Sequence, residues 1–249
     1  MSGHSKWASI KHKKAATDAK RGKIFTKIIR ELTMAARGGG DNESNARLRK
    51  AVADAKAVNM PADNIKRAIQ KGTGQLEGTQ IEEIIYEGYG PGGVAIYVTA
   101  LSDNKNRTVS EVRHIFTKNG GRLGEQGSVA YRFKRLGYID VEKAKASEEK
   151  LMDIALTAGA DDIKDDGSSW EIITSPETYE AVLEAVKTAG IEVADANVGY
   201  IPQDYTKLEG KQAQQTLKLV EELEDHDDVQ TVSANFDIDE EEIAKFGQA

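Results

Sequence analysis

The spacing of apolar residues changes from helical to strand-like across the glycine-rich stretch 72–79, and this change constrains the fold more than any other feature. Before it, apolar positions recur every three or four residues in three segments, at 24–36, 44–59 and 61–72. Three consecutive glycines at 38–40 end the first segment, and Pro61 suits the first turn of the third. The sequence therefore predicts three short helices, preceded by Met1–Arg21 as an arm or an additional amphipathic helix.

Beyond residue 79 the pattern predicts strands at 81–86 and 94–101, followed by a helix capped at Asp103-Asn104. Alternation of Val129, Tyr131 and Phe133 with Ala130 and Arg132 predicts a half-buried strand at 128–133. From Gly137 a complete β-α-β-β-α-β order follows, with its last strand at 191–196, which is the ferredoxin-like order. One more helix and strand after Pro202 supply the α-β pair that the middle unit lacks.

At 249 residues the chain is too long for one ordinary hydrophobic core. We therefore predict a multi-domain α+β protein in which the last domain is inserted into the middle one. Its parts are a basic three-helix domain at 1–78, a discontinuous middle α/β domain at 79–136 plus 204–249, and an inserted ferredoxin-like domain at 137–203. The last long helix ends in the acidic run 221–228, which is unfavourable for the helix dipole and has no explanation in this fold.

The charges of the chain are separated along its length. Residues 1–72 hold seventeen Lys and Arg against six Asp and Glu, a net charge of +11, so the chain's total of −7 leaves −18 for the rest. Positive charge gathered at one end of an acidic chain is typical of an element that binds nucleic acid, and Trp7 adds a ring that could stack on a base. A solvated basic helix with Trp7 in a core is the alternative. The candidate contact residues are Lys6, Trp7, Lys11, His12, Lys13, Lys14, Lys20, Arg21, Lys23, Lys27 and Arg30.

A second contact is predicted in the middle domain from two segments. The loop 87–93 holds more glycine than a hairpin needs, and the helix beginning near Asp103 places two cations at its positive end. A plain hairpin turn is the favoured alternative for the loop, and a simple N-cap explains the helix start equally well. The candidates are Tyr89, Gly90, Gly92, Gly93, Asn104, Lys105 and Arg107.

Other classes of function find little support. The chain has no cysteine, its four histidines are scattered, and no Ser/His/Asp set or close carboxylate pair indicates catalysis. The acidic cluster Asp161, Asp162, Asp165 and Asp166 misses the spacing of a calcium loop and is better read as a solvated turn. With no long apolar run and no apolar signal-peptide core, we expect a cytoplasmic protein without enzymatic activity, metal, cofactor, membrane contact or small-molecule substrate.

Several motifs closely resemble the YebC family. They are GHSKWASIKHKKAATDAKRGKIFTKIIRELTMAAR at 3–37, NMPADNIKRAI at 59–69, YEGYGPGGVA at 86–95, DNKNRTVSEVRHIFTKNGG at 103–121 and GSVAYRF at 127–133. The resemblance implies three domains, one helical and two α/β. It also implies a cytoplasmic protein of a kind described as a probable DNA-binding transcriptional regulator. A mitochondrial relative activates translation of cytochrome oxidase subunit I, and some bacterial members are linked to the ribosome and to synthesis of proline-rich stretches.

Two binding functions therefore lead, a DNA-binding transcriptional regulator and an RNA- or ribosome-binding translation factor. Lys and Arg contact phosphate in both nucleic acids, so the arm does not separate the two. Trp7 favours RNA through stacking, whereas the family's description favours DNA. A nucleic-acid-processing enzyme and a structural scaffold are weaker alternatives.

Overall fold

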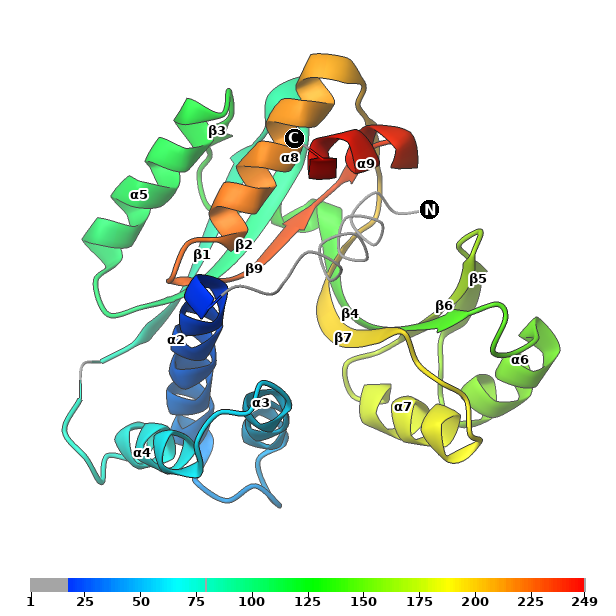
Figure 1. The fold of residues 1–249 in the computed structure, drawn as a ribbon, viewed down its shortest axis with the longest axis horizontal. Coiled ribbons are helices and arrows are strands. Elements are labelled where there is room, and N and C mark those ends of the chain that lie inside the picture. Colours follow the sequence, from blue (N-terminus) through cyan, green and yellow to red (C-terminus); the bar gives the residue numbers. More distant parts are fainter. Residues whose placement is uncertain (1–17, 79, 249) are drawn as a thin grey trace.

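The computed structural model describes residues 18–78 and 80–248. They form three units (Figure 1): a helical unit, a middle sheet with its helices, and a second sheet with its own helices. The predicted fold class, multi-domain α+β with an N-terminal helical region, is confirmed. Among the described helices, none combines the length and the apolar character needed to cross a membrane.

The helical unit consists of α2 (Asp18–Ala35), α3 (Ala46–Ala57) and α4 (Ala62–Gly72), with a 3-10 turn, η1 (Ala36–Gly38), after α2. Asn45 joins two of these helices: its side-chain oxygen accepts the N–H of Leu48 at 3.0 Å and caps α3, while its Nδ2 donates to the carbonyl of Ala35 at 2.8 Å. The core of the unit is formed by Leu32, Ala35, Leu48, Ala51, Ala55 and Ala68.

The turn between α3 and α4 depends on Asn59, which adopts a left-handed φ of 56°. This conformation lets the N–H of Met60 reach the carbonyl of Ala55 at 2.9 Å, which closes the end of α3, and Met60 is then buried in the core. The motif 59–69 is thus explained by helix packing within this unit.

The middle unit contains β1 (Glu82–Tyr89), β2 (Ala95–Ser102), α5 (Lys105–Lys118), β3 (Arg122–Leu123), α8 (Gly210–Glu224) and β9 (Val229–Ala234). Its sheet has the order β3-β1-β2-β9 with antiparallel neighbours, so a strand from the end of the chain lies beside β2. Helices α5 and α8 cover one face of the sheet (Figure 1), with Phe116, Leu217 and Val220 fully buried between them and the strands. A short parallel pair, β8 (Thr206–Lys207) and β10 (Phe236–Asp237), and helix α9 (Glu240–Gln248) complete the unit.

The third unit contains β4 (Phe133–Glu142), α6 (Glu148–Thr157), β5 (Asp162–Asp165), β6 (Ser169–Thr174), α7 (Tyr179–Thr188) and β7 (Asp195–Pro202). The order β5-β6-β4-β7, antiparallel throughout, is the ferredoxin-like arrangement that the sequence predicts. Both helices pack on one face over Ile139, Leu151, Ile172 and Val182. The long ribbon β4-β7 also connects this unit to the middle one (Figure 1).

Two sequence predictions about elements are wrong, and one helix was missed. Residues 128–132 are not a strand but a turn followed by a 3-10 helix, η3 (Ala130–Arg132), and the strand begins at Phe133 and continues without a break through Gly137. The last strand of the third unit begins at Asp195 and not at 191. Helix α9 was not predicted, because it opens with three glutamates and has only Ile243, Ala244 and Phe246 as apolar positions.

Candidate nucleic-acid interface

The predicted basic arm is only partly within the described residues. Lys6, Trp7, Lys11, His12, Lys13 and Lys14 lie outside them, and Lys20 and Arg21 fall in the first turn of α2. Lys23, Lys27 and Arg30 are described with their side chains, and all three point toward the middle unit. The part of the predicted arm with described side chains therefore forms a contact within the chain.

The three cations of α2 bind the C-terminal end of α8. Lys23 Nζ donates to the carbonyl of Asp225 at 3.0 Å, Lys27 Nζ to that of Glu224 at 2.5 Å, and the Arg30 guanidinium to that of Asp227 at 2.6 Å. The last carbonyls of a helix have no partner within it and carry the negative end of its dipole. The acidic side chains at the C-terminal end of α8 make this end still more negative, and the cations of α2 compensate the charge. This contact explains the acidic run 221–228.

Asp228 is the charged centre of the same interface. Its side chain is 2% exposed, it pairs with Arg30, and its Oδ2 accepts from Arg107 at 2.8 Å and from Thr108 at 2.5 Å. Burial alone raises the pKa of this carboxyl, but the hydrogen bonds from Thr108 and Arg107 and the charge of Arg30 outweigh burial, so its pKa is below the ordinary value of 3.8. One carboxylate thus ties α2, α5 and the start of β9 together.

A cleft of about 770 Å³ lies beside this centre, between α2, α5 and the loop after α8. Its lining mixes Lys23, Arg30 and Arg107 with Glu111, Asp225 and Asp227. Because these cations are already bound to carboxylates or carbonyl groups, the cleft does not present the surplus of positive charge that a phosphate would need.

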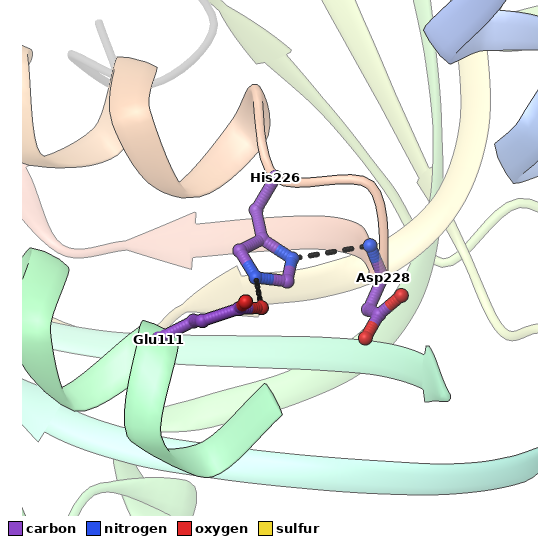
Figure 2. A group of neighbouring side chains, drawn as sticks. All are labelled: Glu111, His226 and Asp228. Carbon is purple, nitrogen blue, oxygen red and sulfur yellow. Dashed lines mark hydrogen bonds and ion pairs between the residues drawn. The ribbon is translucent and has the colours of Figure 1, made fainter. Parts of the chain in front are cut away.

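Glu111, His226 and Asp228 each bring one potential metal ligand to within 4.8 Å of the other two (Figure 2). The backbone N–H of Asp228 donates to Nδ1 of His226 at 3.1 Å, so the ring proton resides on Nε2, which donates to Glu111 at 2.9 Å. Both imidazole nitrogens are thus engaged, and the two guanidinium groups beside Asp228 oppose a further cation. The group is therefore better explained as a hydrogen-bonded link between α5 and the loop after α8 than as a metal site.

A second set of cations on the helical unit is exposed and unpaired. Lys56 on α3 and Lys66, Arg67 and Lys71 on α4 are exposed, and none of them forms an ion pair with a residue in the ranges 18–78 and 80–248. Exposed cations without partners keep their full attraction for a polyanion. Sequence reasoning did not single them out, although the net charge counted to Gly72 includes them.

The two segments of the predicted second contact lie far apart. Tyr89 is at the end of β1 that pairs with Ala95, whereas Ser102, which precedes Asn104, pairs with Glu82 at the opposite end. Strands rise about 3.3 Å per residue, so the eight residues of β1 place the two ends of the hairpin roughly 23 Å apart. Tyr89, Gly90, Gly92 and Gly93 therefore do not form one contact with Asn104, Lys105 and Arg107.

Close packing explains the glycines of the loop. A Cβ on Gly88 would lie 2.6 Å from the ring of Phe116, and one on Gly92 would overlap Leu208. Gly92 and Gly93 also have left-handed φ values of 71° and 81°, as the turn η2 (Pro91–Gly93) requires. The surplus of glycine over an ordinary hairpin comes from the helices and loops that press on this turn.

At the other end of the hairpin the N-cap interpretation agrees with the geometry. The side-chain oxygen of Asn104 accepts the N–H of Arg107 at 3.1 Å, and the Arg107 guanidinium turns back to Asp103 and Asp228. Lys105 is exposed at the first position of α5. The acidic cluster likewise forms a turn, where Asp165 pairs with Lys143 at 2.5 Å and accepts the N–H of Gly167 at 2.8 Å.

Sequence reasoning missed Tyr131, which the alternation at 128–133 places in a core. Its side chain is 73% exposed, the highest value among the large apolar side chains of the described residues. The glycine at 127, with a φ of 85°, is the local signal that a turn precedes it.

Comparisons with known proteins agree with the observed architecture. A family model described as the TACO1/YebC protein N-terminal domain matches residues 5–75, and one described as the TACO1/YebC second and third domain matches residues 81–236. A crystal structure of a conserved hypothetical protein from Aquifex aeolicus superimposes with a TM-score of 0.78 at 49% sequence identity, covering 89% of this chain and 92% of that one.

Relatives with assigned names are similar over their whole length. A "Probable transcriptional regulatory protein" of Koribacter versatilis is 63% identical, covering 98% of each chain. One of Solibacter usitatus with the same designation is 58% identical over 100% of both chains.

Proposed function

The chain belongs to the TACO1/YebC family, and from this premise we propose that it is a cytoplasmic, nucleic-acid-binding regulatory protein, in the first place a DNA-binding transcriptional regulator. The designation of its relatives as probable transcriptional regulatory proteins supports a regulatory role. An activity as an enzyme is not part of the proposal, since the group around His226 is occupied by its own hydrogen bonds.

One observation carries the proposal: some cations of the helical unit contact the middle unit, whereas others are exposed and unpaired. Lys23, Lys27 and Arg30 face inward and hold the middle unit. Lys66, Arg67 and Lys71 are exposed on α4 without ion-pair partners among the described residues. Arg67 and Lys71 are four residues apart and so lie on the same side of the helix. An unpaired row of cations on the basic part of an acidic protein supports phosphate binding.

A second candidate is an RNA- or ribosome-binding translation factor. It is favoured by the exposed ring of Tyr131, because aromatic side chains that protrude from a protein commonly stack on unpaired bases. Crosslinking of the protein to the genome and its co-sedimentation with ribosomes, compared in the same cells, separate the two candidates.

Salt dependence of binding tests the proposed function. If about five to eight cations contact phosphate, log K should fall with log salt with a slope of about −4 to −7. Replacing Lys66, Arg67 and Lys71 together by Gln should flatten that slope by about two to three units without lowering the melting temperature. An exposed control triple on the third unit, Lys150, Lys164 and Lys187 to Gln, should leave the slope as it is. A full-length protein that binds neither duplex DNA nor structured RNA at low salt would refute the proposal.

A further inference from the structure

The loop that carries Tyr131 is fixed by a buried carboxylate. Glu87 on β1 is 4% exposed, and its two oxygens accept the backbone N–H groups of Gly127 at 2.6 Å, Val129 at 2.7 Å and Ala130 at 2.8 Å. A buried charge is costly unless hydrogen bonds satisfy it, and here all three donors come from one short loop. The geometry of the loop is therefore set by a strong, long-range interaction and not by local preference.

Further contacts hold both sides of the same loop. The hydroxyl of Tyr89 donates to the carbonyl of Ser128 at 2.8 Å, and Arg132 forms a bidentate pair with Asp204. Val129 and Phe133 are buried in a small core with Tyr97. The backbone on either side of Tyr131 is thus anchored, while the ring of Tyr131 itself points into solvent at 73% exposure.

The surroundings of the ring are cationic and aromatic. Arg132 follows it directly, and the guanidinium of Arg122 lies 5.2 Å from the centre of the Tyr89 ring. Arg132 is held by its pair with Asp204, whereas Arg122 is exposed and forms no ion pair with a described residue. The exposed residues Glu125 and Gln126 add no apolar surface. A protein partner would need a continuous apolar patch, whereas a single protruding ring with one unpaired guanidinium group on the same loop region suits a base next to its phosphate.

From this arrangement we propose that Tyr131 is a stacking platform for an unpaired base of a single-stranded nucleic acid, with Arg122 beside an adjoining phosphate. The inference rests on the proposed function and deepens it by naming the form of nucleic acid bound. In a duplex both faces of a base are covered by its neighbours, so only an unpaired base has a face free for the ring. The anchored loop reduces the conformational entropy that Tyr131 loses on binding. Tyr89, which the sequence suggested as a contact residue, instead supports the loop through its hydrogen bond to Ser128.

Fluorescence anisotropy with the full-length protein tests the inference. The probes are a labelled single strand of about twelve nucleotides, within the usual range of single-strand sites, and a duplex of the same sequence, each as RNA and as DNA. Tyr131→Ala should weaken single-strand binding about 5- to 150-fold, which corresponds to the loss of one stacked base, and should leave duplex binding unchanged. Tyr131→Phe should retain the affinity. A larger loss with RNA than with DNA identifies RNA as the source of the base, and the reverse identifies DNA.

Two controls separate stacking from other causes. Stacking releases no counterions, so the salt slope of Tyr131→Ala should equal that of the unchanged protein, in contrast to the Lys66, Arg67 and Lys71 variant. Because the ring is exposed, the melting temperature should also stay within the range of ordinary surface substitutions. Single-strand affinity that is unaffected by Tyr131→Ala, or lost equally for duplexes, overturns the inference alone. Absence of all nucleic-acid binding by the full-length protein removes the proposed function and this inference with it.

Discussion

Arg30 on α2 pairs with Asp228, a residue 198 positions further along the chain whose side chain is only 2% exposed. The pair lies where the helical unit meets the middle unit, and Asp228 also binds Arg107 and Thr108 of α5. A buried carboxylate with several cationic and hydroxyl partners fixes the relative position of the elements that supply them. The attachment of the basic unit to the acidic body is therefore a specific contact and not a general attraction between opposite charges.

Removing this carboxylate should destabilise the protein. Asp228→Ala leaves Arg30 and Arg107 without their partner, and we expect a loss of about 3 kcal/mol in the free energy of unfolding, at the low end for buried pairs because both guanidinium groups retain contact with water. Urea denaturation gives this difference. Asp54→Ala, which removes the exposed pair with Lys50 on α3, is the control and should change the free energy by less than about 1 kcal/mol. Equal effects of the two substitutions would contradict the central role of Asp228.

The same contact should weaken in acid. The pKa of Asp228 is lower in the folded protein than its ordinary value of 3.8, so the folded state binds this proton less readily than the unfolded state. Its contribution to stability is complete above pH 3.8 and is lost as the pH falls through the folded pKa. We expect Asp228→Asn to be less stable than the unchanged protein at pH 6, with the difference shrinking below pH 3.8. Melting curves measured across this range check the sign, and a difference that grows in acid would contradict it.

The sequence predicts those elements whose ends are determined locally. Asn45, Asn104 and Ser147 each accept a backbone N–H three residues ahead, and all three helices begin next to the residue that caps them. The local pattern around Tyr131, in contrast, led to a wrong prediction. The alternation of Val129, Tyr131 and Phe133 is that of a strand. The carboxylate of Glu87, about forty residues away, accepts backbone N–H groups of this loop, so these groups cannot pair with another strand.

The sequence also could not predict that Lys23, Lys27 and Arg30 contact the middle unit. Each of these residues binds a carbonyl about 200 positions away, and a pattern of cations at helical spacing is the same whether it faces phosphate or the end of another helix. The acidic run at 221–228 was visible, but its partner was not. Charge separation along a chain indicates which segments attract each other or a polyanion, and only the fold decides between the two.

The glycine loop offers a test of packing against ligand contact. Gly92 and Gly93 both have left-handed φ values, but a Cβ on Gly92 would overlap the buried Leu208, whereas one on Gly93 has no atom of a described residue within 4 Å. Gly93→Ala should cost about 1–2 kcal/mol from backbone strain alone. Gly92→Ala should cost about 1–3 kcal/mol more, from overpacking. Denaturant unfolding gives both values, and nucleic-acid affinity of the folded variants should be unchanged. A loss of affinity without a loss of stability would restore the loop as a contact.

Glu87 should act on binding only through the position of the loop. In Glu87→Gln the side-chain amide group can accept at one oxygen only, so at least one of the N–H groups of Gly127, Val129 and Ala130 loses its partner, at a cost of about 1–3 kcal/mol. Hydrogen exchange at these three amides should accelerate, whereas exchange in the helical unit should not change. We expect single-strand affinity to fall in Glu87→Gln but the salt slope to stay the same. Unchanged exchange at all three amides would show that the carboxylate does not fix the loop.

The open face of the third sheet carries an electrostatic strain that substitution should relieve. Asp140 on β4 lies directly opposite Glu171 on β6 and Asp195 on β7, so three carboxylates form a row across the sheet. Burial, together with the charges of Asp166 and Asp195, raises the pKa of Asp140 above its ordinary value of 3.8. Like charges directly opposite one another destabilise a sheet by about 0.2–1 kcal/mol per pair. We therefore expect Asp140→Asn to raise the free energy of unfolding at pH 7.

The pH dependence of this gain identifies its cause. Because the folded pKa is raised, the folded state takes up the proton before the unfolded state does, and the unchanged protein regains stability as the pH falls from the folded pKa toward 3.8. The advantage of Asp140→Asn should thus be largest at neutral pH and vanish in acid, opposite in direction to the acid loss at Asp228. Asp153→Asn, an exposed change on α6, is the control and should change little at any pH. An advantage of Asp140→Asn that persists below pH 3.8 would have to come from packing, and the row of carboxylates would then not be the source of the strain.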